Sequence, residues 1–294
     1  CLATGFSQSC CNTPHSLEIL SLEEDGIATQ LDVVSSIEGF IFDLDGTVYR
    51  GDELLPGAKQ VVDELREKDK GPVFLSNKAL ERRSAYARQL TRLGVPTDVD
   101  QIINSSLVTA RYLVERDPDA PVYVIGEGPL IEELENHGIE ISVDPGEIRY
   151  VVASFDRDFH YDKLRIAYDA IKNGAGFIAT NADRTCPVKG GEVPDAAGMI
   201  GAIEGVTGKK LEMIAGKPST YMLQSALDIL ELDSDSCLLV GDRLETDIRM
   251  ALDHNITAVL VLTGVTDRED LQNSPIKPDY VLETLEDFPS IISL

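Results

Sequence analysis

The stretch Phe40-Ile41-Phe42-Asp43-Leu44-Asp45-Gly46-Thr47 decides the fold of this chain. Its three consecutive apolar residues predict a short strand that is buried on both faces, as strands of a parallel sheet are. Asp43 and Asp45 follow two residues apart, and carboxylates this close repel one another unless a cation lies between them. Asp45-Gly46 taken alone also suits a simple turn. The stretch therefore predicts a buried strand that ends in a candidate metal site.

Strands and helices are expected to alternate on both sides of a central region. Short apolar runs predict strands, and apolar residues at helical spacing predict helices between them. A long helix is expected from just after Asn77 to about Leu93, and another after Asp247. The pattern predicts an α/β fold with a Rossmann-like, doubly wound parallel sheet. The strands expected in this sheet are 40–42, 72–75, 237–240, 258–262 and 280–282.

The middle of the chain has a different character. Its predicted strands have polar and charged surroundings, and a loop that contains glycine and proline runs over 181–198. These features predict a second, inserted α/β unit. Its expected strands are 122–125, 150–153 and 177–180.

These patterns predict the domain boundaries. We expect a discontinuous core domain made of residues 38–118 and 212–294, with an inserted α/β cap domain at 119–211. Residues 1–37 are polar, contain three cysteines and show no sustained periodicity. We interpret them as a disordered or loosely attached N-terminal lead.

The composition excludes several classes of protein. The chain has 26 Lys and Arg against 51 Asp and Glu, a formal net charge of −25, which argues against a nucleic-acid partner. It contains no apolar run of about 18 residues and no secretory signal, so we expect no membrane partner. The five cysteines match no zinc or disulfide pattern, and we expect a cytoplasmic location. Because the acidic residues are spread along the whole chain, we hypothesise that the protein is adapted to a cytoplasm with a high salt concentration.

Four polar points each follow a predicted strand or open a predicted helix. Ligands of an open parallel sheet bind beyond the carboxyl ends of its strands, so we expect these points to converge. They are Asp43 with Asp45, Ser76 with Asn77, Lys217, and Asp242 with Asp247.

The residue types at these points suit phosphoryl transfer. Asp43, Asp45 and Asp242 form an oxygen-rich set of the kind that Mg²⁺ prefers. One carboxylate can attack phosphorus, and the second can protonate the leaving oxygen and then activate water. Ser76 with nearby backbone N–H groups can hold phosphate oxygens, and Lys217 supplies positive charge.

The same four points resemble the four motifs of the haloacid dehalogenase superfamily of phosphatases. Asp43-Leu44-Asp45-Gly46-Thr47 is similar to the first motif and Phe74-Leu75-Ser76-Asn77 to the second. Gly216-Lys217-Pro218-Ser219 is similar to the third motif, and the run from Gly241 to Asp247 to the fourth. The resemblance covers about residues 38–294, and its four motifs in order are far more specific than any one of them.

Further residues indicate a subfamily within this superfamily. Val48-Tyr49-Arg50-Gly51 resembles the NagD-like subfamily, subfamily IIA, which carries a large α/β cap between the second and third motifs. Within it, Ser76-Asn77-Lys78 and the run from Ala197 to Glu204 look closest to the AraL-type sugar phosphatase branch. Many members have Asn where Lys78 stands, which leaves the role of position 78 open.

The resemblance implies roles for the metal and the acidic residues. Asp43 is expected to be the nucleophile and a Mg²⁺ ligand. Asp45 is expected to be the general acid/base and to ligate Mg²⁺ through its backbone carbonyl. Asp242 would be the third protein ligand, with Asp247 in the outer shell.

The resemblance also implies the groups that bind substrate. Ser76, Asn77 and Lys217 are expected to bind the phosphoryl group. In related caps the loop after an Ala-Thr-Asn motif faces the leaving group. By that match, the expected specificity residues are Asp183, Arg184, Thr185 and Cys186.

The function implied is that of a Mg²⁺-dependent phosphomonoester hydrolase, which forms an aspartyl-phosphate and acts on a small phosphorylated metabolite. A sugar phosphate is the first expectation, and a nucleoside monophosphate or phosphoglycolate is the alternative. A non-enzymatic alternative is an inactive regulatory or binding protein of the same fold. The resemblance also implies a homodimer formed through the cap.

Overall fold

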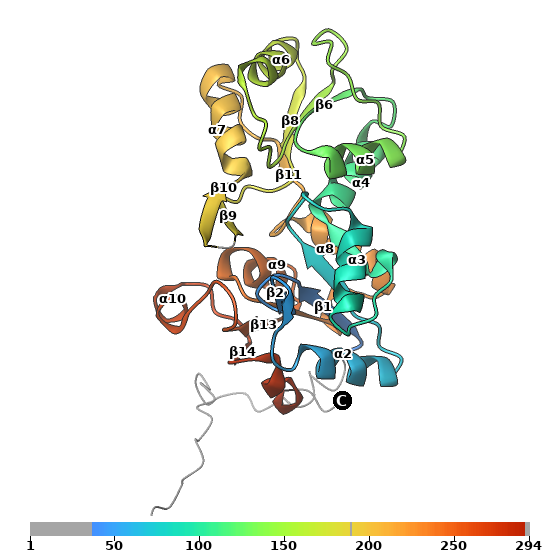
Figure 1. Ribbon diagram of the computed structural model, residues 1–294, viewed down its shortest axis with the longest axis vertical. Coiled ribbons are helices and arrows are strands. Elements are labelled where there is room, and N and C mark those ends of the chain that lie inside the picture. The colour runs from blue at the N-terminus through green and yellow to red at the C-terminus, as the bar shows by residue number, and fades with distance from the viewer. Residues whose placement is uncertain (1–36, 189, 292–294) are drawn as a thin grey trace, which may run out of the picture.

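Two parallel sheets organise the residues that this computed structural model describes, 37–188 and 190–291 (Figure 1). The predicted lead at 1–37 lies outside the described residues except for Ile37. The Ile37 side chain is 1% exposed and packs in the core, so the lead ends at residue 36 at the latest.

The first sheet has six strands in the order β14-β13-β12-β1-β4-β5, and every neighbouring pair is parallel. The chain adds β4 and β5 on one side of β1 and then, after the second sheet, β12, β13 and β14 on the other side, which confirms the predicted doubly wound α/β fold. The strands are β1 (Gly39–Asp43), β4 (Val73–Ser76), β5 (Ile102–Asn104), β12 (Cys237–Gly241), β13 (Thr257–Val261) and β14 (Tyr280–Leu282).

Alternate side chains of β1 enter different layers of the core. Phe40 and Phe42 pack in one apolar cluster, and Phe42 meets Phe288 with ring centroids 6.1 Å apart. Ile41 packs in the cluster on the opposite face, together with Met222. All three β1 side chains are fully buried, which stabilises the fold by roughly 1.5–3 kcal/mol for each large side chain. Both faces of β1 are therefore covered, as its three consecutive apolar residues predicted.

The helices that cover this sheet leave its carboxyl edge open for the site. They are α2 (Ala58–Glu67), α3 (Arg83–Arg92), α4 (Ser105–Arg116), α8 (Thr220–Leu230), α9 (Arg249–Asp253) and α10 (Arg268–Asn273). Short 3₁₀ helices, η1 (Val99–Gln101), η2 (Ser234–Ser236) and η4 (Leu285–Ser290), precede β5, precede β12 and follow β14.

The second sheet forms the cap, with strand order β11-β8-β7-β6. Its last strand, β11, extends beyond the predicted cap boundary at residue 211, because Met213 pairs with Ile178 of β8. The strands are β6 (Val122–Ile125), β7 (Tyr150–Ala153), β8 (Gly176–Ala179) and β11 (Met213–Ile214). The cap helices are α5 (Gly128–Asn136), α6 (Tyr161–Lys172) and α7 (Ala196–Thr207).

Two antiparallel hairpins complete the fold. The hairpin of β9 (Thr185–Val188) and β10 (Gly191–Pro194) hangs from the cap toward the core sheet (Figure 1). A smaller hairpin of β2 (Tyr49–Arg50) and β3 (Glu53–Leu54) follows the first motif.

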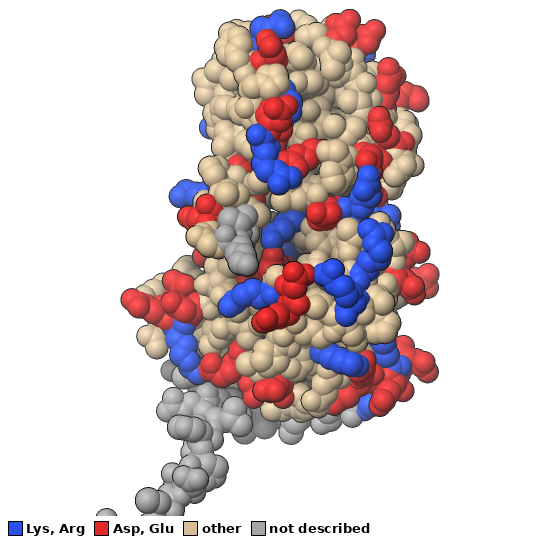
Figure 2. Space-filling model, in the orientation of Figure 1, with Lys and Arg blue, Asp and Glu red and all other residues tan. Residues whose placement is uncertain are grey.

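Apolar and charged contacts join the two sheets. One apolar cluster runs from Ile41 of the core through Leu107 of α4 to Val124 of the cap. Two Arg–Glu ion pairs, Arg82 with Glu132 and Arg83 with Glu133, connect the start of α3 to α5. Figure 2 shows basic and acidic side chains gathered where the two domains meet.

One predicted helix begins later than expected. The helix predicted from just after Asn77 begins only at Arg83, because residues 77–82 form an irregular segment. The segment is fixed by contacts such as the hydrogen bond from Lys78 N to Ser76 Oγ, 3.2 Å. None of the helices in the described ranges is both long and apolar enough to cross a membrane.

Candidate active site

Three strands deliver polar groups to one edge of the core sheet. Asp43 is the last residue of β1, Ser76 is the last residue of β4, and Asp242 directly follows β12. The parallel register keeps neighbouring strands level, since Phe42 pairs with Val240. Because β1 lies between β4 and β12, where the direction of winding reverses, these side chains meet at the switch point of the sheet.

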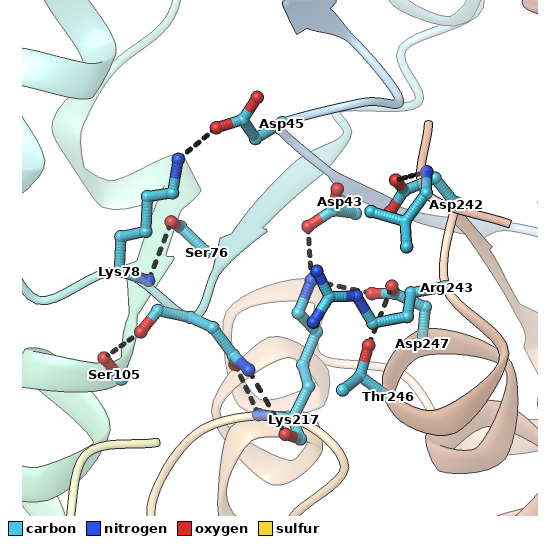
Figure 3. Close-up of polar contacts among 12 residues, drawn as sticks. Asp43, Asp45, Ser76, Lys78, Ser105, Lys217, Asp242, Arg243, Thr246 and Asp247 are labelled. Carbon is cyan, nitrogen blue, oxygen red and sulfur yellow. Dashed lines mark hydrogen bonds and ion pairs between the residues drawn. The ribbon is translucent and has the colours of Figure 1, made fainter. Parts of the chain in front are cut away.

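Lys217 reaches this edge from the loop between β11 and α8. The Asn77 side chain holds its backbone from both sides: Oδ1 accepts from Lys217 N at 2.7 Å, and Nδ2 donates to Lys217 O at 3.3 Å. Gly216 is required here, because a Cβ at this position would lie 2.6 Å from Asn77 Oδ1. The Lys217 ammonium then donates to Asp43 Oδ1 and lies 2.7 Å from Asp247 Oδ1 (Figure 3).

Asp247 lies in a π-helical turn, η3 (Leu244–Ile248), and the helix expected after it is α9, which begins at Arg249. Its side chain packs against Gly241, where a Cβ would come within 2.2 Å of the Asp247 Cβ. Its Oδ2 accepts from the Thr246 hydroxyl at 3.1 Å, while Oδ1 faces Lys217. Asp247 and Asp43 therefore hold the ammonium of Lys217 together.

Asp242 occupies a close-fitting position between two backbone segments. Its Oδ2 accepts from Val265 N at 2.7 Å. A Cβ on Gly264 would lie 1.7 Å from Asp242 Oδ2, and one on Gly46 would lie 2.4 Å from the same atom. The glycine of the first motif thus allows the two acidic loops to approach one another.

This cluster contains more acidic side chains than basic ones. Burial raises the pKa of Asp43 to about 8, against the lowering effect of Lys217, and the Asp247 and Asp242 charges raise it further. Burial, then the charge of Asp247, raise the pKa of Asp242 to about 6. Burial lowers the pKa of Lys217, but Asp247 and Asp43 outweigh it, and the net shift is upward. Three buried carboxylates therefore share one ammonium group.

This excess of negative charge fits a divalent cation. Within the described ranges, no three Asp, Glu, His or Cys side chains are grouped so that they could hold a metal on their own. The predicted set needs only the carboxylates of Asp43 and Asp242 plus the backbone carbonyl of Asp45. Mg²⁺ is commonly bound in this way, with one or two carboxylates, substrate phosphate and retained waters. The donor chemistry thus fits the predicted ion.

Asp45 lies apart from this cluster and meets Lys78 instead (Figure 3). The Lys78 ammonium donates to Asp45 Oδ2, and both side chains are about one-third exposed, 29% and 34%. Burial lowers the pKa of Lys78, but the Asp45 charge outweighs it and the net shift is upward. The predicted acid/base therefore has a cation beside it.

The cap residue Asp183 reaches the core sheet. Its Oδ2 accepts from Asn181 at 2.9 Å and from Asn77 at 3.3 Å, and its Oδ1 accepts from Arg243 at 3.2 Å. Asn77 and Arg243 belong to the second and fourth motifs, so this carboxylate bridges the cap to both. Its predicted part in substrate selection stays a prediction.

The other predicted specificity residues lie at the start of the β9–β10 hairpin. Arg184 is exposed, Thr185 is half-buried and Cys186 is buried. Burial raises the pKa of the Cys186 thiol, against the lowering effect of Lys78. The hairpin therefore places Cys186 near Lys78.

Some residues that organise the site were not predicted from the sequence. Arg243 stands inside the fourth motif, beside Asp242, and position in that motif could have marked it. Asn181 follows Thr180 in the Ala-Thr-Asn motif and could have been marked in the same way. Their shared contact with Asp183 depends on how the cap sits over the core, which no local pattern shows.

Comparisons with known proteins agree with this geometry. Residues 40–140 match the family model for haloacid dehalogenase-like hydrolases, and residues 214–288 match a second model of the same kind. The chain is 39% identical over 256 residues to the sugar-phosphatase AraL of Bacillus subtilis, covering 87% of this chain and 93% of that protein. It is 33% identical over 303 residues to the chloroplastic phosphoglycolate phosphatase 1A of Arabidopsis thaliana, covering 95% and 82%.

Solved structures give the same result. A 4-nitrophenylphosphatase from Thermotoga maritima superposes with a TM-score of 0.83 at 35% identity, covering 88% of this chain and 98% of that one. NagD from E. coli K-12 superposes with a TM-score of 0.78 at 28% identity, covering 85% and 97%. These matches span both sheets and all four motifs. The chain therefore belongs to the haloacid dehalogenase-like hydrolases, in their NagD-like subfamily, and is a hydrolase of phosphoric monoesters.

Proposed function

We propose that this protein is a Mg²⁺-dependent sugar phosphatase that works through an aspartyl-phosphate on Asp43. The observation that carries the proposal is the arrangement of Asp43, Lys217 and Asp247. Lys217 engages Asp43 Oδ1 and Asp247 Oδ1, which leaves Asp43 Oδ2 without a hydrogen bond from the described residues. A carboxylate fixed at one oxygen and free at the other is suited to in-line attack.

The first step consumes the ester. Asp43 Oδ2 forms a bond to phosphorus while the bond from phosphorus to the ester oxygen breaks. Asp45 gives its proton to that oxygen, which leaves as the alcohol of the sugar. Lys217 keeps its proton throughout, holds Asp43 in position and offsets the negative charge that gathers on the phosphoryl oxygens.

The second step releases phosphate. Asp45, now a carboxylate, takes a proton from a water molecule whose oxygen forms the new bond to phosphorus. The bond between phosphorus and Asp43 Oδ2 breaks, and Asp43 returns as a carboxylate. Ser76, which is buried at the end of β4, and nearby backbone N–H groups are proposed to bind the phosphoryl oxygens, as Asn77 is.

When bound, Mg²⁺ would neutralise phosphate charge at Asp43, Asp242 and the backbone carbonyl of Asp45. Asp247 would act outside this set, through Lys217, as its ion pair at 2.7 Å supports.

A sugar leaving group is supported by the charges around the site. Lys78, Lys217 and Arg243 are each paired with a carboxylate of the protein. A leaving group with a second negative charge would gain little from cations that are already neutralised. A neutral polyol meets no such penalty, and the 39% identity to a sugar phosphatase supports the same choice.

Phosphoglycolate is the second candidate, and one observation favours it. Arg184 is exposed at the start of the hairpin and has no ion pair among the described residues. A guanidinium there could pair with the carboxylate of glycolate. Arg184→Ala separates the two candidates, because it should raise KM for phosphoglycolate and leave KM for a sugar phosphate within about twofold, since a neutral polyol forms no ion pair there.

The deciding experiment measures kcat/KM with Mg²⁺ over a panel of sugar phosphates, nucleoside monophosphates and phosphoglycolate. We expect the highest value for a sugar phosphate. A nucleotide or phosphoglycolate preferred by tenfold or more, about 1.4 kcal/mol, would contradict the substrate assignment. Loss of all turnover on removal of the divalent cation, with recovery on adding Mg²⁺, tests the metal.

We also propose that the protein is a cytoplasmic homodimer that associates through the cap. The family resemblance supports this proposal. Light scattering of the full chain should give twice the monomer mass of 32.1 kDa. A monomer at micromolar concentration would contradict the proposed homodimer.

A further inference from the structure

Lys78 places a second ammonium group at the active site, on the side opposite Lys217. It belongs to the irregular segment after β4, two residues beyond Ser76. Neither the phosphoryl group nor the metal needs this charge in the mechanism above. Among the described residues, its ammonium forms an ion pair with Asp45 alone, the proposed acid/base.

The backbone around Lys78 is fixed on both sides. Lys78 N donates to Ser76 Oγ at 3.2 Å, and Lys78 O accepts from the Tyr86 hydroxyl at 3.4 Å. Tyr86 itself is 4% exposed in α3, so the anchor is part of the core. The side chain therefore starts from a defined position and extends toward Asp45 (Figure 3).

The orientation of the Asp45 side chain, in contrast, depends on Lys78. Within residues 37–188 and 190–291, its carboxylate forms an ion pair with Lys78 and takes no other hydrogen bond. Its side chain is 34% exposed, so packing does little to select a rotamer. General acid/base catalysis needs the carboxyl group within hydrogen-bond distance of the leaving oxygen, and a loosely held group loses rate.

We propose that Lys78 is a positioning residue for Asp45. Its ammonium holds Asp45 Oδ2, so that Oδ1 is directed to the leaving oxygen in the first step and to the attacking water in the second. The proton moves between Asp45 Oδ1 and these oxygens, while Lys78 keeps its own protons and offsets the carboxylate charge left on Asp45. This inference rests on the acid/base role proposed for Asp45.

The test compares two aryl esters that differ in their need for a proton. The phenol of phenyl phosphate leaves with a pKa of about 10, like the tyrosine side chain, and needs protonation. The nitrophenol of 4-nitrophenyl phosphate is a much better leaving group and needs little acid catalysis. Since kcat/KM reports the first step, Lys78→Met should lower it for phenyl phosphate by about 10–100-fold and for 4-nitrophenyl phosphate by about threefold or less.

Three further variants complete the design. Lys78→Arg should recover most of the loss, because it keeps a cation in place. Asp45→Asn should show the same dependence on the leaving group, and adding Lys78→Met to it should cost little more, since the two act together. Lys163→Met is the matched control: Lys163 forms a partly buried ion pair with Asp156 in the cap, 2.7 Å long, and its loss should change neither ester's kcat/KM.

The outcomes are distinct. Equal losses on both esters, or a change confined to KM, would refute the positioning role of Lys78. A large further loss when Lys78→Met is added to Asp45→Asn would show that Lys78 acts independently of Asp45, and would also refute it. If Asp45→Asn itself shows no dependence on the leaving group, the proposed role of Asp45 fails first, whichever substrate the enzyme prefers. Melting temperatures of all variants check that the fold is kept.

Discussion

At the scale of single residues, the site depends on the different roles of the two carboxylate oxygens of Asp43. One oxygen is engaged by Lys217, and the other is left for phosphorus. Asp43→Asn keeps the shape and removes the nucleophilic charge. We expect turnover of 4-nitrophenyl phosphate to fall by roughly 10³-fold or more, the loss typical of a removed nucleophile.

Two measurements accompany this variant. Its melting temperature should not fall, because the substitution removes one of three buried carboxylates that repel each other. Asp158→Asn, a change to a side chain that is 88% exposed in the cap, should leave turnover within about twofold, as surface substitutions usually do. An Asp43→Asn enzyme with turnover near that of the wild type would refute the assignment of the nucleophile.

The raised pKa values at the same residues predict how pH acts on the protein without metal. Asp43 and Asp242 have pKa values of about 8 and about 6 in the folded chain, above the usual value of 3.8. The folded state therefore binds more protons than the unfolded state over this interval. Stability from these groups is present at low pH and is lost as pH rises through about 6 and then about 8.

The expected result is a melting temperature in EDTA that falls between pH 5.5 and 8.5. Added Mg²⁺ should raise it most at the alkaline end, where the carboxylates are ionised. Asp242→Asn should flatten the fall in EDTA and remove the response to Mg²⁺. A wild type whose stability in EDTA rises over this range would contradict the charge distribution described here.

At the scale of elements, Asp183 links the cap hairpin to two core motifs. Its carboxylate bonds to Asn77 and Arg243, which lie 106 and 60 residues away in the chain. Asp183→Ala would remove these contacts together. Hydrogen bonds to charged groups contribute about 1.5–3 kcal/mol when buried, and these are partly exposed, so we expect roughly 1–2 kcal/mol of local stability to be lost.

Hydrogen exchange measures this loss directly. Backbone amides of β9 and β10 should exchange about tenfold faster in Asp183→Ala, which corresponds to about 1.4 kcal/mol, while amides of β1 and β12 keep their protection. Asp162→Ala is the control, because this cap side chain is 72% exposed on α6. Unchanged exchange in the hairpin would show that other contacts hold it.

The elements also show what sequence reasoning can reach. Asp43, Ser76 and Asp242 were predicted to converge because each ends a recognisable apolar run, and parallel strands bring such ends together. The short strand β5, Ile102–Asn104, has only two apolar residues in a row and gave no usable signal. Residues 213–214 were not predicted as a strand and fell within the expected core range, because strand β11 forms only by pairing with β8 of the cap across 33 intervening residues.

The contacts between the cap and the core were beyond prediction for a related reason. The bond from Arg243 to Asp183 depends on the orientation of two domains, which follows from the packing of α4 against both sheets. The pair of Lys78 and Asp45 depends on an irregular segment where a helix was expected. Local periodicity describes single elements and carries no information about either arrangement.

At the scale of the whole molecule, the net charge of −25 sets the response to salt. Acidic side chains are scattered over the whole face seen in Figure 2, and their mutual repulsion is relieved when the chain unfolds and expands. Salt screens this repulsion, since the Debye length falls from about 10 Å at 0.1 M to about 3 Å at 1 M. The folded state should therefore gain stability from a simple salt such as KCl.

We expect the melting temperature to rise by about 3–6 °C between 0.05 and 1 M KCl, equivalent to roughly 1–2 kcal/mol. Ion pairs such as Arg82 with Glu132 weaken under the same screening, but surface pairs of this kind contribute at most about 1 kcal/mol each. Repulsion among 51 acidic residues against 26 basic ones should outweigh them. A melting temperature that is flat or falls with KCl, with full activity at low salt, would contradict the hypothesis that the acidic surface is adapted to a salty cytoplasm.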